Sequence, residues 1–285
     1  MSTTASGAPA VALDDELVAA LARLGREANA VTVLTPATAR KFDRLTLRVD
    51  LRGGAAVKAR RLESPATVRE LVRLRQPLGS AYTAVLEYEG RTIVEEWIEG
   101  VPLEVLRADE QRLEEAGALL GRLHGLPSGT TGELETGAFL AAAVNDLGEC
   151  RSDGVLTEDE VHRLSEIVHR LDPGSTPQAL IHRDFCAENI VLDSDGALRV
   201  IDNEWVAVGS PGLDLGRTRS RWPMSGDGWT AFVAGYRAVR PIDEETLPFW
   251  SVAVAAWSIR LRLGWGPAAV AVPLEVLRTA LEESS

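Results

Sequence analysis

The first hundred residues alternate between stretches with the hydrophobic period of a helix and stretches of β-prone composition. Three leucines share one helical face in residues 14–24, behind acidic residues that suit a helix N-terminus. β-Prone runs at 41–50 and 55–61 flank a turn signal at 52–54, so they predict two hairpin strands. A second helix is predicted over 64–75, because a serine suited to capping precedes a proline suited to the first helical position.

Beyond Gly100 the pattern becomes helical. Residues 109–123 place apolar side chains on one face, and a capping box at 157–160 opens another amphipathic helix. The polar segment 145–153 between them is expected to be irregular. The most apolar stretch, 247–257, runs into charged residues and is too short to span a bilayer of about 30 Å, so we expect a buried helix and no membrane partner. The break near Gly100 is the predicted lobe boundary.

The length of 285 residues exceeds the roughly 100 to 200 expected of one domain, which favours two packed lobes. The two cysteines, Cys150 and Cys186, give neither a disulfide framework nor metal-ligand spacing. We therefore expect a cytoplasmic protein. Residues 1–12 lack the basic start and apolar run of a signal peptide and are expected to be disordered.

The formal net charge is −12 at pH 7. Nucleic acid binding requires a basic face, so this balance argues against nucleic acid as a partner. It leaves a cationic or neutral substrate, because an acidic protein attracts cationic ligands through the summed field of its clefts. The commoner explanation of such a balance is solubility. The charge therefore excludes one class of partner without identifying another.

Residues 180–202 carry the most informative pattern, LIHRDFCAENIVLD followed by RVID. Two β-prone apolar runs surround the turn signal at 193–196, which predicts a hairpin. A tight hairpin returns Asn189 and Asp202 to the same end. Asp184 precedes Asn189 by five residues and can lie on the same loop.

These residue types are the ones that phosphoryl transfer requires. A γ-phosphoryl group in transfer spreads negative charge over its oxygens, so positioning and Mg²⁺ supply most of the catalysis. Mg²⁺ prefers hard oxygen ligands, which Asn189 and Asp202 supply. Asp184 can accept the proton of an acceptor hydroxyl. The alternative, a chance tripeptide among solvated acids, does not explain all three residues in order on a loop, a hairpin and a strand.

The chain resembles the aminoglycoside phosphotransferase and choline kinase-like group over about residues 30–285. The resemblance is carried by His182-Arg-Asp184 with Asn189, by Ile201-Asp-Asn-Glu204, by Asp214-Leu-Gly, and by segments like a nucleotide-binding lysine strand (Ala55-Ala-Val-Lys58) and a hinge (residues 93–100). It implies an α+β, two-lobed protein kinase-like fold. A small antiparallel-sheet N-lobe at 13–99 would bind nucleotide, and a larger, mainly helical C-lobe at 100–285 would hold the catalytic and substrate-binding residues.

In the N-lobe the resemblance implies that Lys58 contacts the α and β phosphates of ATP or GTP. Glu70 on the next helix would orient Lys58, with Glu63 as the alternative partner. The backbone from Glu96 to Ile98 would face the purine.

In the C-lobe the resemblance implies that Asp184 is the catalytic base. Asn189 and Asp202 would hold magnesium. His182 and Asp214 resemble the pair that braces the catalytic loop, without taking part in the chemistry.

Several side chains are candidates for the acceptor: Glu204, Asp146, Glu149, Asp153, Trp222 and Trp229. The acids of 145–153 are equally explained as a solvated loop, and the tryptophans as core residues, since large aromatics dominate buried packing. The basic run 217–221 either meets an anionic or phosphorylated acceptor or pairs with neighbouring acids.

The chain also departs from the pattern it resembles. Arg183 stands where small-molecule kinases of this group usually have glycine, and Asn203 replaces the usual aromatic after the metal-binding aspartate. No glycine-rich loop precedes the lysine strand, and residues 34–41 are either a phosphate-covering loop or an ordinary turn. Only eleven residues separate Asp202 from Asp214, too few for a regulated activation loop, which favours a small-molecule acceptor.

Two hypotheses of different classes follow. The first is a kinase that phosphorylates a hydroxyl of a small molecule, with an antibiotic-type natural product ahead of a primary metabolite such as choline, a sugar or homoserine. The second is a catalytically silent nucleotide-binding scaffold. The presence of all the candidate catalytic residues favours the first.

Overall fold

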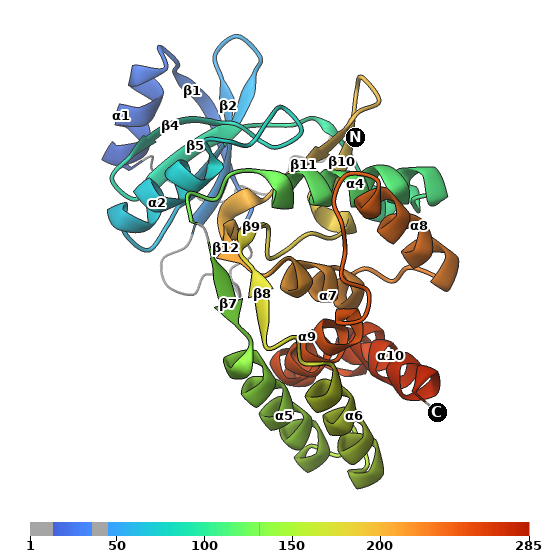
Figure 1. Ribbon diagram of the computed structural model, residues 1–285. Helices are drawn as coiled ribbons and strands as arrows, with labels where there is room; N and C mark the ends of the chain where they lie inside the picture. The colour runs from blue at the N-terminus through green and yellow to red at the C-terminus, as the bar shows by residue number, and fades with distance from the viewer. Residues whose placement is uncertain (1–13, 36–44, 131, 285) are drawn as a thin grey trace, which may run out of the picture. The chain divides into compact units, whose positions relative to one another are not determined.

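A computed structural model describes residues 14–35, 45–130 and 132–284 of the chain. Residues 1–12, which the sequence predicts to be disordered, lie outside the described residues. Most of the segment 34–41 does so too. The chain divides between Glu99 and Gly100 into two compact units, here called unit 1 and unit 2. Figure 1 shows the elements of each unit in order along the chain.

Unit 1 is built on a five-stranded antiparallel sheet with the order β1-β2-β3-β5-β4. Its strands are β1 (Ala28–Val33), β2 (Leu45–Leu51), β3 (Ala56–Arg61), β4 (Val85–Glu89) and β5 (Thr92–Glu96). The predicted hairpin is therefore confirmed for the described part of its first strand and for its second strand. Alternating side chains of β3 point to opposite faces, so Val57 and Lys58 serve different surroundings.

Two helices of unit 1 begin at the predicted caps. Asp14 accepts the backbone N–H of Leu17 at 2.8 Å to open α1 (Asp15–Arg23), and the helix buries its leucines with Val57 of β3 in one apolar cluster. Ser64 likewise opens α2 (Pro65–Arg75). The end of α2 carries the buried Arg75 to Glu95 of β5.

Unit 2 is mainly helical. Its α-helices are α3 (Leu103–Leu106), α4 (Glu110–Gly125), α5 (Gly137–Ser152), α6 (Glu158–Leu171), α7 (Pro211–Arg221), α8 (Gly226–Arg237), α9 (Leu247–Arg262) and α10 (Pro267–Glu283). The helices predicted from 109–123, from the capping box at 157–160 and from 247–257 correspond to α4, α6 and α9. A small antiparallel-sheet unit followed by a larger helical unit confirms the predicted α+β, two-lobed fold.

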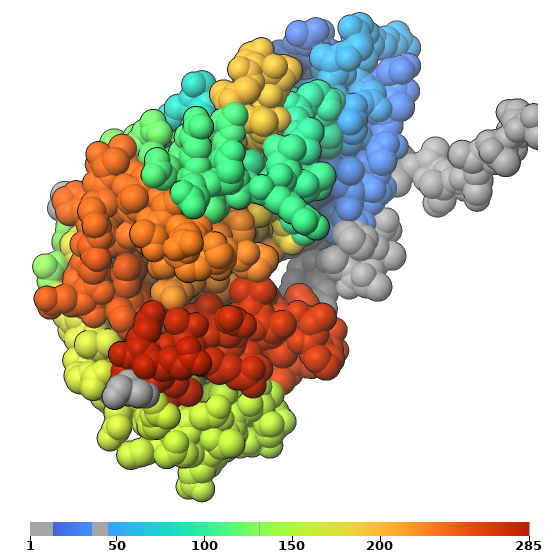
Figure 2. Space-filling view, turned by 90° about the vertical axis from the view of Figure 1, so that its right-hand side faces the viewer, coloured from blue at the N-terminus to red at the C-terminus, as the bar shows by residue number. Residues whose placement is uncertain are grey.

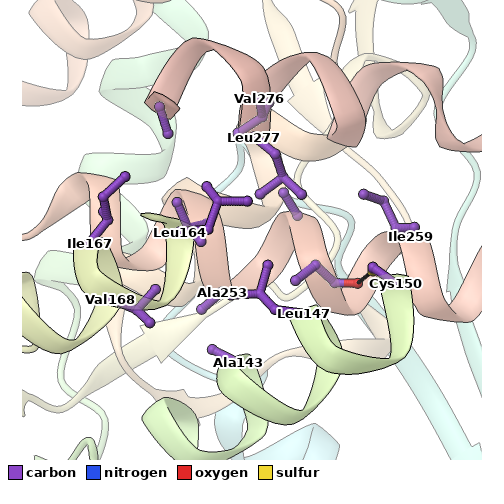
Figure 3. Packing of buried hydrophobic residues seen from close by; sticks show 14 of the residues in the cluster. Ala143, Leu147, Cys150, Leu164, Ile167, Val168, Ala253, Ile259, Val276 and Leu277 are labelled. Atoms are coloured by element: carbon purple, nitrogen blue, oxygen red, sulfur yellow. Dashed lines mark hydrogen bonds between the residues drawn. The ribbon is translucent and has the colours of Figure 1, made fainter. Parts of the chain in front are cut away.

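A large apolar cluster lies where α5, α6 and α10 pack around α9 (Figure 3). The segment 145–153, predicted to be irregular, is instead the end of α5. The prediction was wrong because Leu147 and Cys150 continue the helical face that packs on α9, while Glu149 between them is exposed. No helix in the described part of the chain is long and apolar enough to cross a membrane.

Short strands set the geometry of the connecting loops in unit 2. They are β6 (Gly100–Pro102), β7 (Glu133–Glu135), β8 (Ser175–Pro177), β9 (Ala179–Ile181), β10 (Ile190–Asp193), β11 (Leu198–Val200) and β12 (Ala207–Gly209). β10 pairs with both β11 and β6, and β9 pairs with β12. The predicted hairpin over 190–201 is therefore present as β10 and β11.

Close packing of α4 on α8 positions two buried side chains that the site uses. A Cβ at Gly117 would lie 1.9 Å from the carbonyl oxygen of Phe232, and one at Gly235 would lie 1.9 Å from that of Glu114. Only glycine fits at such distances. The two helices therefore approach closely enough for His124 and Tyr236 to form a hydrogen bond.

Candidate functional site

The candidate catalytic loop, 182–189, connects β9 to β10 and is fixed at its start by one carboxylate. Asp214 on α7 accepts the backbone N–H of His182 on Oδ2 at 2.5 Å and that of Arg183 on Oδ1 at 2.6 Å. Asp214 is fully buried. Its position follows from the topology, because β12 pairs with β9 and leads directly into α7.

The imidazole of His182 holds the interior of the loop. Its Nδ1 accepts the backbone N–H of Asp184 at 3.3 Å, so Nε2 carries the proton and donates to Asn203 Oδ1 at 3.0 Å. His182 and Asp214 thus act on the same turn by separate bonds. Between them Arg183 has a φ of 65°, in the left-handed region that favours glycine. The departure from glycine noted in the sequence therefore falls on a strained backbone position.

Three polar residues lie at one end of the β10–β11 hairpin. Asn189 donates from Nδ2 to the carbonyl oxygen of Asp184 at 2.8 Å and to its carboxylate Oδ2 at 3.1 Å. The backbone N–H of Ile201 donates to the carbonyl oxygen of Asn189 at 2.9 Å, which brings Asp202 to the loop. Asp202 has a φ of 62° and turns the chain out of β11.

The oxygen donors at this end suit a magnesium ion. The amide NH₂ of Asn189 is bonded to Asp184, so its Oδ1, a hard oxygen, is the atom left for a ligand. Asp202 contributes a carboxylate, the other ligand type that Mg²⁺ favours. Mg²⁺ usually takes only one or two ligands from the protein and completes its coordination shell with phosphates and water, so two protein oxygens suffice.

Two arginines of the basic run 217–221 contact Asp184. Arg221 Nη1 lies 2.5 Å and Arg217 Nη2 3.2 Å from Asp184 Oδ1, and Arg221 also pairs with Glu188 at 2.8 Å. The ion-pairing alternative for the basic run 217–221 is thus what the structure shows. The signal in the sequence was the four-residue spacing, which places Arg217 and Arg221 on one face of a helix.

A buried network missed by the sequence lies behind the loop. His124 Nε2 lies 3.2 Å from Asp214 Oδ2, and its Nδ1 lies 2.8 Å from the hydroxyl of Tyr236. Burial lowers the pKa of both His124 and His182 despite the nearby carboxylates. Burial alone would raise the pKa of Asp214, but the histidines and the loop N–H groups lower it. At neutral pH the network therefore holds one carboxylate and neutral imidazoles.

In unit 1 the structure does not bring Glu70 to Lys58. Glu70 lies on the exposed side of α2 and hydrogen-bonds Arg73 at 2.6 and 2.9 Å. The inward positions of α2 carry apolar residues and Arg75, so no acid of this helix faces the sheet. The carboxylate next to Lys58 is Glu95, its neighbour across the β3–β5 ladder.

Glu95 is buried and shared by several cations. It pairs with Arg75, and Arg60 lies 3.9 Å away. Burial alone would raise the pKa of Glu95, but the charges of Arg75, Arg60 and Lys58 lower it. The sequence signal was present in the strand 92–96, where two glutamates end an otherwise apolar run.

The hinge residues Glu96 and Ile98 differ in their backbone bonds. The N–H of Glu96 donates to the carbonyl oxygen of Ala84 at 2.9 Å and belongs to the sheet. Within the described ranges, the N–H of Ile98 has no hydrogen-bond partner. Ile98 is therefore the residue of the pair whose N–H is left for a ligand.

The acceptor candidates lie in three separate places in unit 2. On α5, Asp146 and Glu149 pair with Arg260 at 2.6 and 3.5 Å, and Asp153 ends the same helix. Burial raises the pKa of Asp146. Glu204 lies in the short helical turn after Asp202.

The two candidate tryptophans pack on the core and line a hollow. Trp222 and Trp229 both contact the ring of Phe232, with centroid distances of 6.1 and 5.5 Å. They line a cavity of about 720 Å³ between the start of α8 and α10, two helices that appear in orange and red in Figure 2. None of Asp184, Asn189 and Asp202 lines it.

Residues 30–246 match the model of the phosphotransferase enzyme family. The solved structures that share the fold include two antibiotic phosphotransferases and a choline kinase. A macrolide 2'-phosphotransferase of Brachybacterium faecium is 16% identical, with 92% of this chain and 96% of that chain covered and a TM-score of 0.60. A choline kinase of Streptococcus pneumoniae is 14% identical, with 92% and 96% covered and a TM-score of 0.61. A thermostable mutant of an aminoglycoside phosphotransferase is 14% identical, with 93% and 98% covered and a TM-score of 0.62.

Proposed function

The chain belongs to the phosphotransferase enzyme family, and we propose that it is a small-molecule kinase that transfers the γ-phosphoryl group of ATP or GTP to a hydroxyl of an antibiotic-type natural product. The observation that carries the proposal is the convergence of Asp184, Asn189 and Asp202 at one end of the β10–β11 hairpin. A base that orients the acceptor and oxygen ligands for the metal are recurring parts of phosphoryl-transfer sites.

Each residue has one role in the proposed reaction. Asp184 orients the acceptor hydroxyl and takes its proton as the new bond from oxygen to phosphorus forms and the bond from phosphorus to the bridging oxygen of the donor breaks. Asn189 Oδ1 and Asp202 would hold Mg²⁺. When bound, Mg²⁺ neutralises the charge that develops on the phosphate oxygens. The nucleoside diphosphate is the leaving group, and Lys58 binds its phosphates.

Asp214 and His182 support this chemistry without touching the acceptor. Their bonds to the backbone of the loop hold the carboxylate of Asp184 in one place, and positioning accounts for much of the rate in phosphoryl transfer. The N–H of Ile98 is suited to an acceptor atom of the purine ring. For the nucleotide donor, the support is family membership and a solved complex of the pneumococcal choline kinase with AMP.

The similar structures are compatible with both an antibiotic-type acceptor and a primary metabolite. A macrolide phosphotransferase and an aminoglycoside phosphotransferase are among those that share the fold, and so is a choline kinase. The choline kinase favours the second candidate, a kinase of a primary metabolite such as choline, a sugar or homoserine. The silent scaffold is disfavoured because every residue that the chemistry needs is present.

The test replaces the proposed base. The protein with Mg²⁺ and ATP or GTP is incubated with aminoglycosides, peptide and nucleoside antibiotics, choline and sugars, and mass spectrometry detects a gained phosphoryl group. Asp184→Asn should keep nucleotide binding and lose about 10²- to 10⁴-fold in turnover, the range for a general base. Asp195→Asn, the same substitution at the exposed hairpin turn, is the matched control. Unchanged turnover in Asp184→Asn would remove Asp184 from the chemistry.

A further inference from the structure

Three arginines of unit 2 surround the proposed base. Arg217 and Arg221 come from α7 and place their Nη atoms on the same oxygen, Asp184 Oδ1. Arg262, at the end of α9, lies within electrostatic reach of both arginines and of Asp184 and Glu188. Arg262 makes no hydrogen bond or ion pair with any residue that the structure describes.

The charges in this cluster do not balance. Arg217 and Arg221 pair with the carboxylates of Asp184 and Glu188, and Arg262 adds a third positive charge within electrostatic reach. With Asp202 counted together with the Mg²⁺ that it would hold, the cluster has an excess of one positive charge. Burial and the two neighbouring guanidiniums lower the pKa of Arg262, which means that these surroundings disfavour its positive charge. A local positive excess in a chain of net charge −12 attracts anions to the position where the acceptor hydroxyl must arrive.

The arrangement is built rather than incidental. The guanidinium of Arg217 stacks over the ring of Trp257 at 4.7 Å, so α9 fixes its plane. Its Nε is buried without a hydrogen-bond partner among the described residues. An arginine whose guanidinium plane is fixed in this way is suited to bind a planar carboxylate or a phosphate through its Nη atoms.

The ion pairs also occupy the atoms that catalysis needs. Asn189 binds Oδ2 of Asp184, and the two arginines bind Oδ1. A base must present an oxygen to the hydroxyl whose proton it takes. An anion carried by the acceptor would draw the guanidiniums to itself and leave Oδ1 for the hydroxyl.

We propose that Arg217, Arg221 and Arg262 bind a carboxylate or phosphate group that the acceptor carries close to its reacting hydroxyl. This inference rests on the proposed function, and it narrows the acceptor to anionic hydroxyl compounds. It runs against the expectation of a cationic or neutral substrate, because the local charge at Asp184 has the opposite sign to the charge of the whole chain.

The first experiment measures anion binding and does not require turnover. Inorganic phosphate is titrated calorimetrically into the protein saturated with Mg²⁺ and the β,γ-imido analogue of ATP, so that the donor site is filled. Arg262→Gln should raise the Kd of phosphate about tenfold or more, the range for a hydrogen bond to a charged group. Arg260→Gln, on the same helix but paired with Asp146 and Glu149, should leave it unchanged.

Asp184→Asn gives the sharper readout. A cluster that binds anions should bind phosphate more tightly once the competing carboxylate is neutral, whereas arginines that only hold Asp184 in place should show no gain. Equal phosphate affinity in the wild type, Arg262→Gln and Asp184→Asn would overturn the inference and leave the proposed kinase activity standing.

The second experiment separates the two sources of the anion. Turnover is compared within matched acceptor pairs: a hydroxy acid against its amide, and a sugar phosphate against the free sugar. We expect one anionic member to be preferred, with Arg262→Gln raising its KM about tenfold and leaving the KM of the nucleotide unchanged. Preferred phosphorylation of the uncharged members would overturn the inference while confirming the kinase.

Discussion

Lowering the pH from 6 to 5 should destabilise unit 2 by an amount set by its two buried histidines. His124 and His182 are the buried members of the four histidines of the chain, and burial lowers the pKa of both. In the unfolded chain they regain a pKa of about 6.5. Below that pH the unfolded state binds protons that the folded state does not, so the free energy of unfolding falls as the pH falls.

The magnitude follows from the number of protons. A group with an unfolded pKa of about 6.5 that stays neutral in the folded state lowers the free energy of unfolding by at most about 1.2 kcal/mol between pH 6 and pH 5. Two such groups give at most about 2.4 kcal/mol. Carboxylates whose pKa is lowered, among them Asp214 and Glu95, contribute in the same direction only as the pH falls below about 4. Asp146, whose pKa is raised by burial, contributes in the opposite direction, so the histidine figure is an upper bound.

The assay is urea unfolding at pH 7, 6, 5.5 and 5, followed by tryptophan fluorescence. Six of the seven tryptophans lie in unit 2, so the signal reports mainly on that unit. His124→Gln removes one of the two protons and should roughly halve the pH dependence between 6 and 5, whatever its effect on stability at pH 7. His162→Gln is the matched control, because the side chain of His162 is 72% exposed.

An equal pH dependence in His124→Gln and in the wild type would refute the reasoning, since it would mean that His124 does not resist protonation in the folded state. A second observable is independent of unfolding. The imidazole C2–H resonance of His124 should not titrate near pH 6.5 in the folded protein, and titration at the ordinary value would contradict the prediction in the same way.

Two further substitutions test the backbone of the loop and the charge cluster of unit 1. Arg183→Gly should be more stable than Arg183→Ala by about 1 kcal/mol in urea unfolding, the reverse of the usual order, because φ is 65° at this position; the opposite order would contradict the strain. Glu95→Gln should lower the stability of unit 1 by about 3 to 5 kcal/mol, because it leaves buried guanidinium groups without their carboxylate, and amide hydrogen exchange of β3 and β5 measures it. Glu70→Gln, on the exposed pair with Arg73, is its control and should unfold like the wild type.

The sequence predicted those parts of the site that lie within one short stretch. The loop, the hairpin and Asp202 follow from turn signals and β-prone runs, which are local. The helices were predictable for the same reason, since Asp14, Ser64 and Thr157 are capping residues that act within three positions. The wrong prediction of an irregular segment at 145–153 also has a local cause. Only Leu147 and Cys150 are clearly apolar on the buried face of this segment, too few to show the helical period.

The contacts that depend on helix packing could not be predicted from the sequence. Arg217 meets Asp184 across 33 positions and His124 meets Asp214 across 90 positions. Such pairs depend on how α4, α7 and α8 pack, and in part on the close approach that Gly117 and Gly235 permit. The error over Glu70 has the same origin, because which face of α2 meets the sheet decides whether an acid can reach Lys58.

The buried carboxylate of Asp214 contacts both the catalytic loop and the packed helices of unit 2. One buried carboxylate accepts two backbone N–H groups of the catalytic loop and contacts the imidazole of His124, so it joins the loop to α4 and, through Tyr236, to α8. A charge in this position is stable only while its donors stay in place, because an unpaired buried carboxylate is costly. The proposed base is therefore positioned by the same bonds that hold the helices of unit 2 together. Changes that loosen α4 against α8 should act on Asp184 even though they lie away from it.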